Sequence, residues 1–263
     1  MGLLPSGRHK QAAHLTALCA LALTVAACQA SPATPPPGPS QATGAAAEVA
    51  APTSAGFPVQ TPGIAVATDF TSASSLTVVV TKRRPLDPVD YVPENLVLLA
   101  DVPVVGEPRL REDAAIAYTA MWATAEAEGA GFVAVSAYRS YEEQRAEHED
   151  YINRYGRQAA ERASARPGHS EHQTGLAVDV NTKAVVSFSA DFGSTTAGQW
   201  LAARAQEFGF IISYPAGKEA VTGYKWEPWH LRYVGIDAAA AMRAAGATTL
   251  QEFAGLEASP DYG

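Results

Sequence analysis

Two short segments in the second half of the chain contain the residue types of a catalytic zinc site. Residues 170–179 (SEHQTGLAVD) place His172 and Asp179 seven positions apart, and the later sequence EPWH adds Glu227 and His230. Together they supply two imidazoles, one carboxylate and a further carboxylate three residues before the second imidazole. A catalytic zinc ion has three protein ligands and an open position for water, with a general base nearby. This inventory points to metal-assisted hydrolysis.

The elements around these segments must bring the donors to one point. Leu176–Val180 alternates apolar side chains and predicts a buried strand with Asp179 on its opposite face. His172 lies in the loop before this strand, and His230 is at the start of a second predicted strand, Trp229–Val234. A lone buried histidine is more often a hydrogen-bonding core residue than a ligand, so the combination carries the argument. Neighbouring strands could bring both imidazoles within about 2.0–2.1 Å of one zinc ion.

The remaining patterns predict helices and strands without a regular βαβ order. Ser140 and Glu143 form a capping box at the start of one of the helices. Glycines, prolines and apolar periodicity set the other boundaries. The chain therefore favours an α+β fold with a single small domain. Helices are predicted at 112–128, 141–154, 198–208, 236–245 and 250–253, strands at 132–138, 176–180, 210–214 and 229–234, a strand or extended arm at 76–81, and a loop at 82–93.

The N-terminal segment has the pattern of an export signal. Residues 1–28 combine a short cationic region with an apolar run that ends in VAAC, which resembles the lipobox of bacterial lipoproteins and predicts lipidation of Cys28. A cleaved signal peptide with a chance cysteine and an uncleaved anchor are the alternatives. All three place the domain outside the cytoplasm. Residues 29–75 are rich in Pro and Ala and predict a disordered tether, followed by a domain at 76–256 and a tail at 257–263.

Charge and cysteine content exclude some classes of protein. The net charge is −8, and the sequence has no cluster of Lys or Arg that could bind a phosphate backbone. We therefore expect no nucleic-acid partner. Both cysteines, Cys19 and Cys28, lie in the leader. The exported domain therefore has no disulfide and must depend on its core, helped by a metal.

Over about residues 77–236 the chain resembles the D-Ala-D-Ala metallopeptidases, most closely the VanY-like D-alanyl-D-alanine carboxypeptidases of the bacterial cell wall. The pattern SxHxxGxAxD followed by ExxH carries this resemblance. The resemblance implies a central antiparallel sheet flanked by helices, a fold shared with lysostaphin-type enzymes and the hedgehog signalling domain. Further matching segments are PLDP and YVP near residues 85–93, SAYRS at 136–140, PG at 167–168, FGF at 208–210 and GYKWEPWH at 223–230.

The resemblance also implies roles for the matched residues. His172, Asp179 and His230 would bind one zinc ion, and Glu227 would be the general base and then the general acid. Arg139 would steady the polarised carbonyl or the terminal carboxylate of the substrate.

Alternatives stay open for the residues near these positions. Arg139 could instead pair with an acid such as Glu143. Ser170 would contact the substrate or support a ligand, and Gln144, one helical turn beyond Arg139, is expected to line the same cleft. Tyr138, Tyr224 and Trp229 would line the pocket or belong to the core. The acids of helix 141–154 are interpreted as a polar face, and His148 as a solvated residue.

These observations predict an exported, lipid-anchored zinc carboxypeptidase that removes the terminal D-Ala from peptidoglycan stem peptides. An L,D-carboxypeptidase or a dipeptidase acting on the same peptides is an alternative, because pocket shape decides between them. A wall-binding module that keeps the metal without catalysis is a third possibility. Glu227 and Arg139 argue against that last function.

Overall fold

The computed structural model describes residues 68–182 and 187–263. Cys28, the predicted lipobox and most of the predicted tether lie outside the described residues. In the part that is described, no helix combines the length and apolar character needed to cross a bilayer.

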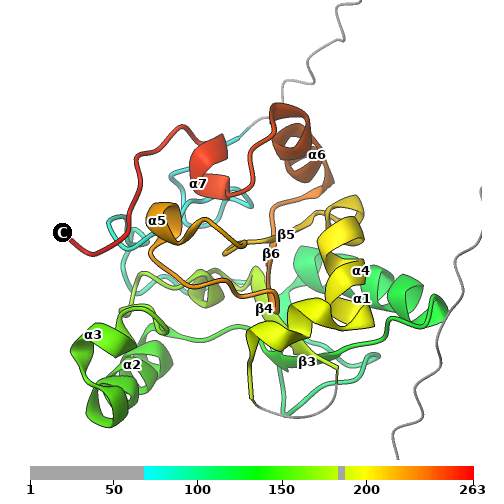
Figure 1. The fold of residues 1–263 in the computed structure, drawn as a ribbon, viewed down its shortest axis with the longest axis horizontal. Coiled ribbons are helices and arrows are strands. Elements are labelled where there is room, and N and C mark those ends of the chain that lie inside the picture. Colours follow the sequence, from blue (N-terminus) through cyan, green and yellow to red (C-terminus); the bar gives the residue numbers. More distant parts are fainter. Residues whose placement is uncertain (1–67, 183–186) are drawn as a thin grey trace, which may run out of the picture. The chain divides into compact units, whose positions relative to one another are not determined.

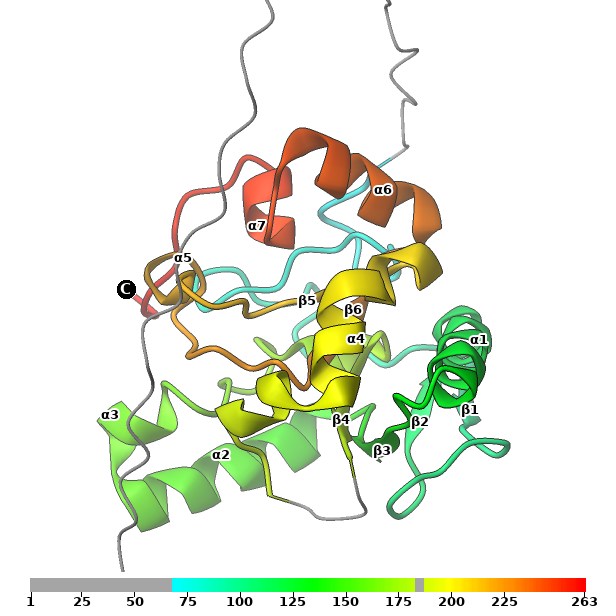
Figure 2. The same ribbon diagram turned by 45° about the vertical axis from the view of Figure 1, so that its right-hand side comes forward.

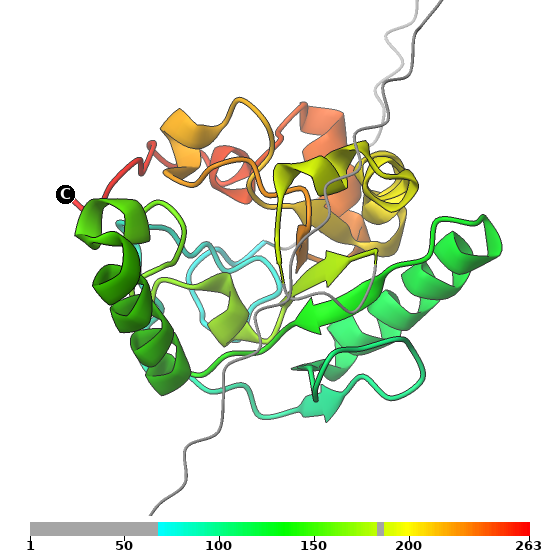
Figure 3. The same ribbon diagram turned by 60° about the horizontal axis from the view of Figure 1, so that its bottom comes forward.

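A four-stranded antiparallel sheet forms the centre of the domain, with the strand order β3-β4-β6-β5 (Figures 1 and 3). Its register pairs Asp179 of β4 directly with His230 of β6. A second, two-stranded sheet pairs β1 with β2. The strands are β1 (Leu96–Leu98), β2 (Arg109–Arg111), β3 (Val133–Ser136), β4 (Ala177–Asn181), β5 (Phe210–Ile212) and β6 (His230–Tyr233). This arrangement confirms the predicted α+β fold with its central antiparallel sheet.

Helices surround this sheet, and α1 and α2 lie at opposite sides of it in all three views (Figures 1, 2 and 3). The α2 helix starts with the predicted capping box, in which Ser140 and Glu143 each accept from the other's backbone N–H. The helices are α1 (Glu112–Ala127), α2 (Tyr141–Tyr155), α3 (Arg157–Ala160), α4 (Thr196–Arg204), α5 (Glu219–Thr222), α6 (Ile236–Ala245) and α7 (Leu250–Phe253), with 3-10 turns η1 (Glu171–Thr174), η2 (Ala190–Ser194) and η3 (Ala205–Phe208).

The main core packs α1 and α4 against one face of the sheet. Tyr118 of α1 is fully buried and meets Phe132 and Phe210 edge-on, with ring centroids 5.8 Å and 6.4 Å away. The alternate residues Leu176, Val178 and Val180 all belong to this core. Because successive side chains of a strand point to opposite faces, Asp179 is directed away from the core, as the alternation predicts. The core thereby fixes the strand that carries one of the candidate ligands.

The segment Leu76–Thr81 joins neither sheet and makes one isolated bridge, between Thr81 and Arg84. It is nevertheless buried, and Arg232 of β6 donates from Nη2 to the carbonyls of Leu76 and Val78, at 3.0 Å each. A buried arginine therefore supplies the hydrogen bonds that a neighbouring strand would have provided. Of the two predictions for this run, the extended arm is the better description.

Packed residues lie beyond both predicted bounds of the domain, 76 and 256. Within the predicted tether, Ala73 is buried and Phe70 packs edge-on against Phe253 of α7 at 6.0 Å. Within the predicted tail, Ser259 is buried and the ring of Tyr262 lies under the Arg166 guanidinium at 4.0 Å. Short packed segments of this kind have no periodicity that a sequence pattern could reveal.

Candidate metal centre

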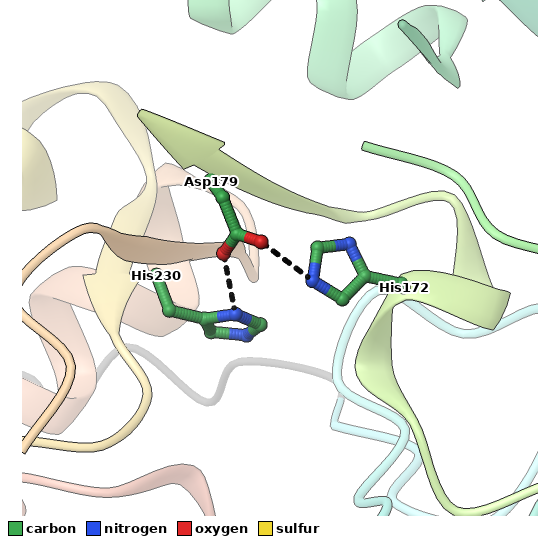
Figure 4. Close-up of side chains that lie close together, drawn as sticks. All are labelled: His172, Asp179 and His230. Carbon is green, nitrogen blue, oxygen red and sulfur yellow. Dashed lines mark hydrogen bonds and ion pairs between the residues drawn. The ribbon is translucent and has the colours of Figure 1, made fainter. Parts of the chain in front are cut away.

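Three side chains from separate elements meet on the face of the sheet opposite the main core. His172, Asp179 and His230 are all buried, and each offers one ligand atom within 4.8 Å of the other two (Figure 4). Asp179 and His230 meet because β4 and β6 pair in that register. His172 comes from the turn η1, which Gly175 closes in the left-handed conformation, at φ 68°. A side chain larger than hydrogen is disfavoured there, which explains the glycine between the two ligands.

Hydrogen bonds orient both rings toward Asp179. His172 uses Nδ1 to contact the carbonyl of Ala137 at 2.6 Å, and its Nε2 lies 3.2 Å from Oδ2 of Asp179. Nδ1 of His230 lies 2.9 Å from Oδ1 of the same carboxylate. Metal-binding histidines commonly donate their second ring N–H to a carbonyl or carboxylate, as His172 does here. The donor set of two imidazoles and one carboxylate therefore fits zinc.

A second buried carboxylate, that of Glu171, contacts the ring of His230 on the side away from Asp179. Oε2 of Glu171 is 3.0 Å from Nε2 of His230, and its Oε1 is 3.4 Å from Nη1 of the fully buried Arg232. Sequence reasoning assigned no role to Glu171. The sequence does place Glu171 beside His172, in a segment expected to be buried. Because an acid is rarely buried without a partner, this position could have indicated a role for it.

The electrostatics of the metal-free group favour a cation. Burial alone would raise the pKa of Asp179, but His172 and His230 outweigh it and hold that pKa well below its usual range. Burial opposes the charge of His230 as well, yet hydrogen bonds with Asp179 and Glu171 raise its pKa to about 10. Burial lowers the pKa of His172 and favours the neutral ring that metal binding requires. In the metal-free state His230 thus carries the positive charge that a metal ion would replace.

Glu227 lies beside this group and faces the same cavity. Its backbone is fixed, because its N–H donates to the carbonyl of Tyr214 at 3.0 Å and its carbonyl accepts from the N–H of His230 at 3.1 Å. Burial raises the pKa of Glu227 to about 8, and the negative charges of Asp179 and Glu171 add to this effect against the opposing charge of His230. A carboxyl group whose pKa lies near neutrality is suited to accept and return a proton.

A cavity of about 700 Å³ opens over the group and contains most of the predicted substrate contacts. Arg139, Gln144, Ser170 and Trp229 line it, whereas Tyr138 does not. The prediction that Tyr138 contacts the substrate is therefore not supported, because its side chain lies outside the lining of this cavity. Trp229 stacks on Phe188 with ring centroids 5.5 Å apart, which forms an aromatic wall.

Arg139 forms an ion pair with Glu147 of α2, while Glu143 is engaged in the capping box. The alternative that Arg139 pairs with an acid of this helix is therefore confirmed, with Glu147 as the partner in place of Glu143. The interpretation of every acid on α2 as part of a polar face and not of a site is wrong for Glu147. Glu147 lines the cavity together with Arg139. Among the residues that the structure describes, none accepts a hydrogen bond from the buried Nε of Arg139.

Two polar side chains of α2, Gln144 and His148, are more buried than the sequence predicts. Gln144 is 1% exposed and donates from Nε2 to the carbonyl of Ala165 at 2.7 Å. His148 was predicted to be solvated, but it is 5% exposed and its Nδ1 contacts the carbonyl of Ser164 at 3.1 Å. The segment after α3 covers this face of the helix, and a pattern within α2 alone cannot show that cover.

Comparison with known proteins agrees with this geometry. Residues 107–236 match the protein family described as VanY, D-alanyl-D-alanine carboxypeptidase. The chain is also 40% identical to the LdcB LD-carboxypeptidase, whose structure it matches with a TM-score of 0.61 over 68% of this chain and 85% of that one. The chain belongs to the VanY family of carboxypeptidases. This confirms the resemblance inferred from the two motifs.

Two other members of the group are informative. A VanY D,D-pentapeptidase from the VanB-type resistance cassette was solved in complex with Zn(II); it is 30% identical, with a TM-score of 0.58 over 70% of this chain and 99% of that one. The protein YodJ of Bacillus subtilis (strain 168) is 42% identical over 158 residues, which cover 58% of each chain. The alignments with the curated relatives span between 33% and 58% of those proteins' own lengths.

Proposed function

We propose that this VanY-family chain is an exported zinc carboxypeptidase that removes the C-terminal D-Ala from peptidoglycan stem peptides. The observation that carries the proposal is the convergence of His172, Asp179 and His230 on one point, with Glu227 on the wall of the same cavity. Zinc bound to a relative of the same fold supports the choice of metal. The family description supports the choice of substrate.

The proposed mechanism assigns a separate task to each side chain. His172, Asp179 and His230 would hold one zinc ion, which when bound supplies a Lewis acid for the scissile carbonyl and for water. Glu227 accepts a proton from the attacking water and then donates it to the leaving amine of the terminal residue. Its place on the wall of the same cavity, beside the three candidate ligands, supports both steps.

Substrate orientation would come from the polar wall of the cavity. The guanidinium of Arg139 lines the cavity and can bind the terminal carboxylate or the developing oxyanion. Ser170 and Gln144 lie on the same wall and would add hydrogen bonds. Trp229, stacked on Phe188, would pack against the apolar parts of the peptide. A volume of about 700 Å³ leaves room for more than the last residue of the stem.

A specific observation favours a second activity. The chain is more similar to the LdcB LD-carboxypeptidase than to the VanY D,D-pentapeptidase, both in identity and in TM-score. An L,D-carboxypeptidase would remove the last D-Ala from a tetrapeptide stem, whereas a D,D-carboxypeptidase would act on a pentapeptide stem. Both reactions use the same metal ligands and the same base, so the walls of the cavity must set the preference.

The location that we propose is the outer face of the cell membrane. The leader with its VAAC sequence supports export and lipidation at Cys28. The Pro- and Ala-rich residues that follow would give the domain reach above the membrane, where peptidoglycan lies.

Mass spectrometry of tri-, tetra- and pentapeptide stems after incubation with the protein tests this function. We expect loss of one D-Ala from the pentapeptide, with loss from the tetrapeptide marking the L,D activity. A chelator should stop the reaction and added zinc should restore it. Glu227→Ala should keep its zinc and lose most turnover, because general acid–base catalysis contributes about 10²–10⁴-fold. A zinc-loaded parent that cleaves none of the three stems would indicate a wall-binding module and refute the proposal.

A further inference from the structure

We propose that Glu171 is a positioning residue for the metal centre: it fixes the orientation and tautomer of His230, and Arg232 fixes Glu171. This inference rests on the proposed metal site formed by His172, Asp179 and His230. It concerns a residue that touches neither the metal position nor the cavity above it, since Glu171 is absent from the cavity lining. Its effect must therefore pass through the ring of His230.

The two ring nitrogens of His230 face different carboxylates. Nδ1 lies 2.9 Å from Asp179, on the side where the ligand atoms converge, and Nε2 lies 3.0 Å from Oε2 of Glu171. An ionised carboxylate can only accept hydrogen bonds, so Glu171 holds a proton on Nε2. The lone pair of a neutral ring is then on Nδ1, where a metal would bind. A carboxylate–histidine–metal arrangement of this kind fixes the ring and raises its basicity as a ligand.

Arg232 holds the other oxygen of the same carboxylate. Its Nη1 lies 3.4 Å from Oε1 of Glu171, while Nε donates to the carbonyl of Tyr233 and Nη2 to the carbonyls of Leu76 and Val78, each at 3.0 Å. The guanidinium is fully buried and is anchored on both sides by backbone groups. It cannot follow a shift of Glu171 without losing these bonds. The carboxylate is thus fixed at both oxygens.

Glu171 is buried between the ring of His230 and the guanidinium of Arg232, and each of its two oxygens faces one of these groups. Removing one partner of a buried ion pair leaves the other charge unpaired and destabilises the fold. A purely structural role for Glu171 therefore predicts a lower free energy of unfolding, with the zinc affinity of the folded protein unchanged. A positioning role predicts that zinc affinity falls as well.

Zinc affinity of the metal-free protein, measured by competition with a chromophoric chelator, separates the two roles. Glu171→Gln keeps the shape and an acceptor for His230 but removes the charge, and Glu171→Met removes both. We expect zinc affinity to fall in the order parent, Gln, Met, with a loss of about 10- to 100-fold for the Met variant. The absorption spectrum of the cobalt-substituted protein should change in the same order, because it reports the geometry of the ligands.

Gln173→Met is the matched control. Gln173 is on the same turn and is fully buried, but it contacts Gly168, Val89 and Tyr91 and none of the three ligands. We expect it to lower the urea midpoint while zinc affinity stays within about twofold of the parent. Arg232 is not substituted, because its bonds to three backbone carbonyls would make the result a test of the fold.

Failure of the positioning role can be distinguished from failure of the proposed function. Zinc affinity within about twofold of the parent in both Glu171 variants would overturn the positioning role, and so would an equal loss in the Gln173 control. If the parent itself failed to bind zinc, the proposed metal site would fall together with this inference. If the parent bound zinc and cleaved no stem peptide, the positioning role could still hold, because affinity and the cobalt spectrum are measured without substrate.

Discussion

Replacing Glu227 by Gln should remove a pH-dependent part of the stability of the metal-free protein. Burial raises the pKa of this carboxyl group from 4.5 to about 8. At about 1.4 kcal/mol for each pKa unit, this difference corresponds to about 5 kcal/mol for a fully enclosed group. The side chain keeps part of its surface open to the cavity. We therefore expect about 2–3 kcal/mol.

The sign follows from which state holds the proton. The folded protein keeps the Glu227 proton at pH values where the unfolded chain has released it. The resulting stabilisation is complete below about pH 4.5, the ordinary value, and is lost as the pH rises through about 8. His230, whose pKa is raised to about 10, adds a similar loss at higher pH, but that contribution is present in both proteins. The difference between parent and variant therefore isolates Glu227.

Urea unfolding followed by tryptophan fluorescence, with chelator present throughout, measures this difference. Between about pH 5 and about pH 9 the free energy of unfolding of the parent should fall by about 2–3 kcal/mol more than that of Glu227→Gln. Glu112→Gln is the control, because Glu112 is an exposed carboxylate at the start of α1. Its curve should run parallel to that of the parent. Parallel curves for the parent and Glu227→Gln would refute the raised pKa of Glu227 in the metal-free protein.

Three further substitutions test the site from other directions. His172→Ala should lose stoichiometric zinc, measured by elemental analysis, and zinc retained at the level of the parent would contradict its role as a ligand. Gly193→Ala would place a Cβ atom 2.5 Å from Cζ2 of Trp226, the residue before the proposed base, so we expect a several-fold loss of turnover with unchanged zinc content. Arg139→Lys keeps the charge but loses the forked geometry, and kcat/KM should fall about tenfold, with an unchanged value arguing against substrate contact.

Local patterns in the sequence predicted the α+β class and the four strands of the central sheet, whereas β1, β2, α3 and α5 were not predicted. The capping box of Ser140 and Glu143 marks the start of α2, because the two side chains bond to the backbone within one turn. The alternation around Asp179 assigned its strand and its face, because that period is a local property of extended backbone. The donor types in the two motifs also indicated zinc chemistry, since the identity of a ligand does not depend on the fold.

Other features of the site depend on contacts between distant parts of the chain. Asp179 meets His230 through the register of β4 and β6, which is set by packing across 51 residues of sequence. The burial of Glu171 against Arg232 and the pairing of Arg139 with Glu147 are equally non-local. Periodicity shows which face of a helix or strand is apolar, but it does not show which other element packs against that face. The three candidate ligands and Glu227 could therefore be named from the sequence, and only the tertiary structure decided their partners, charges and surroundings.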